Sequence, residues 1–355
     1  MTRARKELID LNSTPYYHCI SRCVRRAFLC GVDQLTGNNY EHRKDWVVER
    51  LTELSKVFAI EVCAFAVMSN HTHVVLRVDQ HKAQSWSEEQ VMAQWEKLFS
   101  IPVLVQQYKD GADSAAVALE AKKTIAQWRS RLMDISWYMR SLNEHLARRA
   151  NEEDRCTGRF WEGRYKSQAL LDEAAVLTCM SYVDLNPIRA GISDTPEASD
   201  FTSIQQRIQQ WQQTQWQQPQ AQSNSAKAPA TFEKHHPPVP LMRLVKQSQD
   251  PHRNAIGYTT KDYLELVDWA GRAIRDGKRG AIPTSAPPIL ERLKLNPKTY
   301  LAFVGKPSLE TSARKRYQHN KALGSVAQLK ELATQLGQKF ICGLGDARRL
   351  YTVES

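Results

Sequence analysis

The alternation of apolar and polar positions predicts strands and helices throughout the amino-terminal part of the chain. Aromatic, β-branched and apolar residues alternate over residues 16–23, 61–67, 71–78 and 165–171, which predicts four strands. Apolar residues recur at helical spacing in a second set of segments, which predicts helices over residues 43–58, 87–99, 114–133 and 135–150. Asp172 should cap another helix that runs to about Leu185, where Asn186-Pro187 should end it.

The order of these elements predicts an α+β fold. Strand, helix, hairpin, helices, strand and helix follow one another, which is a β-α-β-β-α-β order with insertions. This order is typical of a ferredoxin-like antiparallel sheet backed by helices. The hairpin turns at Met68-Ser69-Asn70, and its second strand, 71–78, should be central in the sheet.

A Gln-rich stretch predicts the domain organisation. Residues 205–240 are dominated by Gln with Pro, Ser and Ala, and we interpret them as a linker whose first part, through about Trp216, continues a helix. Residues 1–204 then form the first domain. Residues 241–355 form a smaller, mostly helical second domain, to which the sequence assigns no chemistry.

Composition indicates which kind of partner the protein binds. A formal net charge of +11 on 355 residues favours a partner that carries phosphates, such as nucleic acid. No apolar run approaches the length of a membrane span, and no apolar segment follows the basic amino terminus, so we expect a cytoplasmic protein. The seven cysteines are scattered, which favours reduced thiols and offers no clustered zinc site.

The first candidate for chemistry is the pair His71 and His73. Two residues apart on one strand, they project from the same face and lie close enough to share a divalent ion. The alternative is that both rings only pack or form hydrogen bonds within the sheet.

The second candidate is Tyr182 with Asn186. They are four residues apart on a helix of the same domain, so they share one helical face. A phenol is a competent nucleophile once activated, and an amide oxygen is a hard ligand for a metal ion. The alternative for Tyr182 is a core aromatic with its hydroxyl at the surface.

Three ordered segments of the chain resemble the REP-associated tyrosine transposases, which are single-tyrosine members of the HUH endonuclease superfamily. The segments contain Asn70-His71-Thr72-His73, Gly158-Arg159-Phe160-Trp161-Glu162-Gly163-Arg164 and Tyr182-Val183-Asp184-Leu185-Asn186-Pro187. The resemblance covers roughly residues 12–204 and implies the HUH nuclease fold. Thr72 departs from the hydrophobic residue usual between the two histidines, but it should point away from the histidine face.

The resemblance also implies roles and a reaction. His71, His73 and Asn186 would bind Mg²⁺ or Mn²⁺, and Tyr182 would attack single-stranded DNA to give a 5′-phosphotyrosine and a free 3′-hydroxyl. Rejoining would follow, so the expected activity is a transposase-like endonuclease and strand transferase. Two alternatives stay open: a relaxase or replication initiator with the same chemistry, and a DNA-binding protein of REP hairpins that does not cut.

Basic residues interleaved with Phe160, Trp161 and Tyr165 suit single-stranded or hairpin DNA, because cations track phosphates and rings stack on bases. The candidate DNA contacts are Arg22, Arg25, Arg26, Arg155, Arg159, Arg164 and Lys166. The alternative is a solvated charged loop around core aromatics. REP-like palindromes and a nucleoid-associated location follow from the resemblance alone, and both monomer and homodimer stay open.

Overall fold

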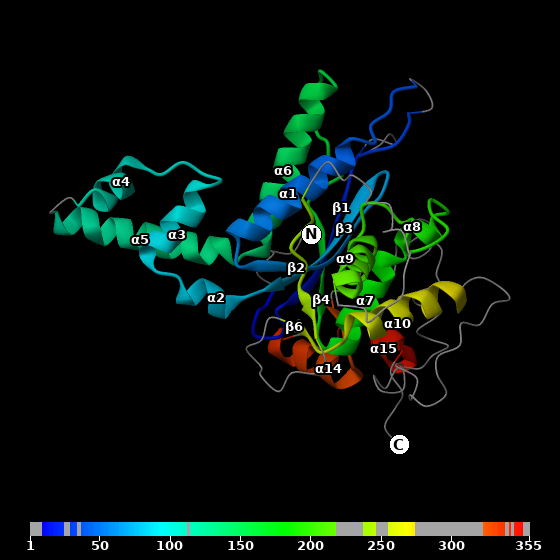
Figure 1. Ribbon diagram of the computed structural model, residues 1–355. Coiled ribbons are helices and arrows are strands. Elements are labelled where there is room, and N and C mark those ends of the chain that lie inside the picture. The colour runs from blue at the N-terminus through cyan, green and yellow to red at the C-terminus, as the bar shows by residue number, and fades with distance from the viewer. Residues whose placement is uncertain are drawn as a thin grey trace.

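A five-stranded sheet lies at the centre of the molecule with helices on both faces (Figure 1). The computed structural model describes residues 9–24, 29–33, 37–111, 114–217, 237–245, 255–273, 322–337, 341 and 344–350. The strands of the sheet are β1 (Tyr16–Arg22), β2 (Ile60–Val67), β3 (His71–Val78), β4 (Lys166–Leu170) and β7 (Ala322–Leu323).

The strand order, β2-β3-β1-β4-β7, confirms most of the predicted topology. Strand β3 lies between β2 and β1 as expected, and the pairs β2–β3, β1–β3 and β1–β4 are all antiparallel. The prediction of a wholly antiparallel sheet is wrong at one edge, because β7 pairs with β4 in parallel and makes the sheet mixed. Strand β7 has only two residues, too few to show an alternating pattern.

Helices form a layer on each face of the sheet. Helices α1 (Arg43–Val57) and α6 (Ile135–Glu153) share one apolar cluster with the side of the sheet that carries Tyr17 and Leu76. The opposite side shares a second cluster with α7 (Glu173–Asp184), α9 (Ser203–Gln217) and α10 (Thr260–Ala273). In Figure 1, α3 (Glu88–Glu96), α4 (Val103–Lys109) and α5 (Ala115–Leu132) extend from the sheet as an arm.

The remaining described elements are short. They are α2 (Gln80–Ser85), α8 (Asn186–Arg189), β5 (Arg243–Leu244), β6 (Ala255–Ile256), α14 (Val326–Gln335) and α15 (Leu344–Leu350). Helices α2 and α4 were not predicted, because one or two turns display too little of the helical period. No helix in the described part of the chain is long and apolar enough to cross a membrane.

A β-bulge in β2 shapes the face that receives α7. The register against β3 shifts between Val62 and Ala64, so Cys63 and Ala64 both join the cluster beneath α7. With Ala66 they present small side chains, which allow the helix to approach closely. Residues 174–184 of α7 are all buried, as expected for a helix that is packed on every side.

The caps of the predicted helices agree with the sequence. Ser87 and Gln90 form a capping box at the start of α3, and Asp172 accepts a hydrogen bond of 2.7 Å from the backbone N–H of Ala175 at the start of α7. The predicted end of this helix at about Leu185 is confirmed, but a further helical turn, which was not predicted, follows it. Helix α7 ends at Asp184, Leu185 keeps a helical conformation, and the one-turn helix α8 follows with Pro187 near its start.

Described residues beyond 240 contact the amino-terminal part directly. Strand β7 extends the sheet, and Tyr263 and Leu266 of α10 are buried in the same cluster as α7. The Gln206 side-chain amide donates a hydrogen bond of 2.6 Å to the backbone carbonyl of Val239. The division at residues 204 and 241 stays a prediction. Two basic clusters of the sequence, Lys278-Arg279-Gly280 and Arg314-Lys315-Arg316, lie outside the described residues.

Candidate active site

The two predicted histidines lie together on the central strand. His71 and His73 pair with Arg22 and Ile20 of β1, and their ring centroids are 4.8 Å apart. Both project from the face covered by α7, as the two-residue period of the strand predicted. His73 is buried, while His71 is partly exposed.

A third histidine, which the sequence analysis missed, completes this cluster. His18 of β1 is fully buried, and its Nε2 lies 2.9 Å from Nδ1 of His73. The planes of the two rings are inclined by 20°, and their centroids lie 5.1 Å apart. His18 belongs to the same face of the sheet because β1 pairs with β3 in the register that places Ile20 opposite His73. That register cannot be read from the sequence of β1 alone.

The end of helix α7 brings Tyr182 to the histidines. Its ring meets His73 edge-on at a centroid distance of 5.7 Å and His18 at 6.2 Å. Asn186 lies beside the phenol one turn further on, because the helical conformation of Leu185 preserves the spacing of four residues. The guanidinium of Arg189, also missed from the sequence, lies over the Tyr182 ring at 5.0 Å.

The environment sets the protonation of the phenol. Burial raises the pKa of Tyr182 to about 12, and the Arg189 guanidinium and the Asn186 side chain oppose that rise. Tyr182 is therefore neutral at physiological pH in this structure. A nucleophilic role requires a further positive charge or a base beside it.

The three imidazoles have the protonation state of metal ligands. Burial lowers the pKa of His18 to about 3 and that of His71 to about 4, and it lowers the pKa of His73 well below the usual range. All three rings are therefore neutral at physiological pH, which is the form that binds metal ions.

The unpaired atoms of the cluster also fit a cation. Nδ1 of His71 lies 2.6 Å from Oδ1 of Asn70, an acceptor, so His71 carries its proton on Nδ1 and leaves Nε2 with a lone pair. Nε2 of His73 is buried and has no hydrogen-bond partner among the described residues. No group of three or more His, Cys, Asp and Glu residues suited to a metal occurs in the described part of the chain, so a site here would need the amide of Asn186.

A buried carboxylate anchors the end of α7 to two other helices. Asp184 accepts hydrogen bonds from the hydroxyls of Ser203 in α9 and Tyr263 in α10, and from the backbone N–H of Ile204 at 2.9 Å. Burial raises the pKa of Asp184 to about 6, and the hydrogen bonds from Ser203 and Tyr263 limit the rise. The helix that carries Tyr182 is thus fixed at its final turn.

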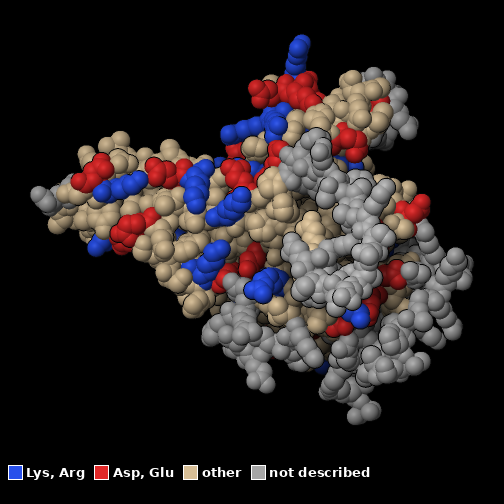
Figure 2. Space-filling view, in the orientation of Figure 1, with Lys and Arg blue, Asp and Glu red and all other residues tan. Residues whose placement is uncertain are grey.

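The predicted DNA contacts are spread over the surface. Arg22 lies opposite His71 and forms an ion pair of 3.6 Å with Glu162. The other described members of the set are exposed, and they are Arg155, Arg159, Arg164 and Lys166. Arg25 and Arg26 lie outside the described residues. In Figure 2, Lys and Arg are interspersed with Asp and Glu on the visible described surface, so this face shows no patch of a single sign.

The aromatic residues near these cations are part of the core. Phe160, Trp161 and Tyr165 are buried, and Nε1 of Trp161 donates a hydrogen bond of 2.8 Å to the carbonyl of Asn143 in α6. Arg164 lines a cavity of about 470 Å³ with Trp161 and Tyr165. The expectation that these rings stack on bases is therefore not supported, because their faces are packed inside the protein.

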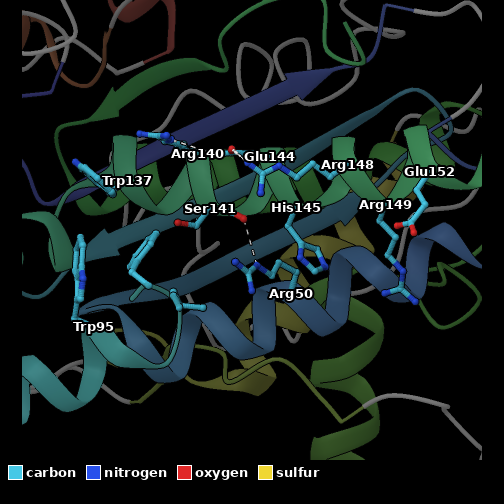
Figure 3. Close-up of a pocket in the computed structure, with 12 residues that line it drawn as sticks. Arg50, Trp95, Trp137, Arg140, Ser141, Glu144, His145, Arg148, Arg149 and Glu152 are labelled. Atoms are coloured by element: carbon cyan, nitrogen blue, oxygen red, sulfur yellow. Dashed lines mark hydrogen bonds and ion pairs between the residues drawn. The ribbon is translucent and has the colours of Figure 1, made fainter. Parts of the chain in front are cut away.

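A second cavity of about 690 Å³ lies between α1 and α6 (Figure 3). Arg50, Trp137, Arg140 and His145 are among the residues that line it, together with residues of α3. None of the predicted site residues lies there, so the histidine cluster and this cavity belong to different faces of the sheet.

Comparison with known proteins gives one weak structural likeness. No family model and no curated protein matches the chain. A solved structure of a REP-associated tyrosine transposase bound to a REP hairpin is similar, with 12% identity and a TM-score of 0.35 over 59% of this chain and 87% of that chain.

Proposed function

We propose that this protein is a metal-dependent DNA endonuclease and strand transferase of the HUH type, with Tyr182 as its nucleophile. The observation that carries the proposal is the contact between Tyr182 and His73, whose ring centroids are 5.7 Å apart although they come from α7 and β3. The three motif segments that resemble REP-associated tyrosine transposases support the same reaction.

Two imidazoles and an amide would hold a divalent ion in this site. His71 and His73 would bind through Nε2, and Asn186 would bind through its side-chain oxygen. When bound, Mg²⁺ or Mn²⁺ would withdraw negative charge from a phosphodiester and favour the ionised phenol.

The residues of the chain then account for the transfer step. The phenol oxygen of Tyr182 loses its proton and attacks the phosphorus, so a bond from phosphorus to the tyrosine oxygen forms. The bond from phosphorus to the 3′ oxygen breaks, and that oxygen takes up a proton and leaves as a 3′-hydroxyl. Arg189, whose guanidinium lies over the phenol ring, would balance the negative charge that develops on the phosphate.

The phosphotyrosine linkage conserves the free energy of the phosphodiester bond that it replaces. A 3′-hydroxyl from the same or another strand can attack it and reverse the step, so no external energy source is required. The proposed substrate is single-stranded or hairpin DNA of the REP type. The proposed contacts to its phosphates are the exposed cations of residues 155–166 together with Arg22.

Covalent capture tests this proposal. A hairpin oligonucleotide with a fluorophore at its 3′ end is incubated with the protein and Mn²⁺, and the products are separated under denaturing conditions. We expect the label to migrate with the wild-type protein, and we expect Tyr182→Phe to abolish that adduct. Tyr108→Phe, which removes a hydroxyl bonded to Glu88 on the α3–α5 arm, is the matched control and should retain it.

Two outcomes would contradict the proposal. An adduct that persists in Tyr182→Phe would show that another residue is the nucleophile. Binding of hairpin DNA by the wild-type protein without any adduct or cut would instead favour a protein that only holds its DNA.

A further inference from the structure

The most unusual polar contact in the core joins His18 to His73. Both side chains are buried, and Nε2 of His18 lies 2.9 Å from Nδ1 of His73. At this distance one of the two nitrogens donates a proton and the other accepts it. The contact therefore couples the tautomer of His73 to that of His18.

We infer that His18 is a positioning residue that accepts the Nδ1 proton of His73 and so holds the Nε2 lone pair of His73 ready for a divalent cation. This inference rests on the proposed function, because it assigns a role toward the metal ion of the same site.

Two observations and one general rule support the assignment. Nε2 of His73 is buried without a hydrogen-bond partner among the described residues, so a cation is the group that would satisfy its lone pair. His71 has the same arrangement, because Asn70 occupies its Nδ1 and leaves Nε2 to bind. In metal-binding imidazoles, the N–H of the second ring nitrogen usually donates a hydrogen bond to an acceptor. This bond fixes the orientation of the ring and raises the basicity of the nitrogen that binds the metal.

Tyr182 adds a second restraint on the ring. The planes of His18 and His73 are inclined by 20°, with centroids 5.1 Å apart, while the edge of Tyr182 meets both rings. His18 therefore limits rotation of His73 on one side, and the phenol limits it on another. The Nε2 atom of His18 is already occupied by His73, so His18 acts through its neighbour rather than as a ligand by that atom.

Metal affinity without DNA tests the inference. Mn²⁺ binding is measured by electron paramagnetic resonance for the wild-type protein and for His18→Phe, which keeps an aromatic ring but has no acceptor. We expect the affinity to fall about 10- to 100-fold. His18→Gln, whose amide oxygen can accept the Nδ1 proton, should recover most of it. His145→Phe is the matched control on the opposite face, in the cavity of Figure 3, and should bind as the wild type does.

The tautomer of His73 provides a measurement that needs no variant at position 18. In histidine-labelled protein loaded with Mg²⁺, nitrogen-15 spectra should show His73 protonated at Nδ1, with the signal assigned by its loss in His73→Gln. A proton at Nε2, or an unchanged Mn²⁺ affinity in folded His18→Phe, would overturn the inference. Absence of Mn²⁺ binding by the wild type would overturn it as well.

The two proposals fail in different ways. If the wild-type protein forms the covalent adduct but His18→Phe binds Mn²⁺ normally, the inference about His18 is wrong and the nuclease proposal stands. If Mn²⁺ affinity depends on His18 but no hairpin is cut, the role of His18 stands and the nuclease proposal is wrong.

Discussion

The two faces of the sheet bury different kinds of side chain. On the α7 face, His18, His73 and Asp184 are buried among apolar residues. On the α1 and α6 face, the corresponding strand positions include Tyr17 and Leu76, which belong to a continuous apolar cluster. Buried imidazoles are costly unless they are paired, so their presence together on one face marks the place where specific chemistry compensates for lost stability.

This contrast predicts that substitutions on the two faces separate activity from stability. A change on the histidine face should remove the chemistry of a protein that stays folded. A change of similar size on the opposite face should lower the free energy of unfolding while the folded fraction keeps its activity.

The largest effect is expected for His71→Ala. Cleavage of hairpin DNA should fall by about 10³-fold or more, because several kcal/mol of transition-state stabilisation depend on the metal site. DNA binding in a gel-shift assay should be largely retained, because phosphate contacts come from the arginines rather than from the imidazole. An equal loss of binding and cleavage would contradict this division.

Leu142→Ala tests the opposite face. Leu142 of α6 is fully buried in the apolar cluster beneath that helix, so its truncation should lower the free energy of unfolding by about 3 kcal/mol. Urea denaturation measures the change. At a temperature where the variant is folded, its rate of adduct formation should equal that of the wild type. A slower rate would show that the two faces are coupled.

Tyr263→Phe tests the anchor of α7. The substitution removes the hydroxyl that donates to Asp184 and leaves one buried carboxylate oxygen without that partner. The free energy of unfolding should therefore fall by about 2 kcal/mol. The ring itself remains buried in the cluster under α10. Tyr40→Phe is the control, because Tyr40 lies outside both apolar clusters. Equal stability of the Tyr263→Phe and Tyr40→Phe variants would show that the anchor contributes nothing.

Thr72→Val should change the free energy of unfolding least, and it should raise it instead of lowering it. The Thr72 hydroxyl is buried, has no hydrogen-bond partner among the described residues, and lies on the face away from the histidines. Replacement by a methyl group of similar shape should therefore stabilise the protein by about 1 kcal/mol. Thermal unfolding checks the prediction, and a lower melting temperature would show that the hydroxyl is satisfied in solution.

Sequence periodicity predicted the elements that position the site. Strand β3 was predicted over its full length, 71–78, because aliphatic residues surround the two histidines in an alternating pattern. Helix α7 was predicted from Asp172, because a capping residue precedes a long apolar run. These two elements bring Tyr182 beside His73 and Asn186, while the metal-binding and catalytic roles of these residues stay proposals that rest on the resemblance.

The parts that were missed depend on relations between distant segments. His18 becomes a neighbour of His73 only through the register of β1 against β3, and periodicity within one strand does not give that register. Arg189 reaches Tyr182 because the chain continues for one helical turn where a proline suggested a stop. Phe160 and Trp161 are buried, which was the alternative for this basic loop, and the hydrogen bond from Trp161 to Asn143 of α6 depends on a contact between distant segments.

The hydrogen bonds of the site also indicate at which stage of protein synthesis the site can assemble. His18 and His73 are 55 residues apart, and the bond from Tyr263 to Asp184 spans a further 79 residues. A nascent chain therefore carries its histidines long before Tyr182 is made, and α7 is anchored only after α10 has emerged. Because contacts of such long range form late, the proposed catalytic centre would not be assembled in a ribosome-bound fragment.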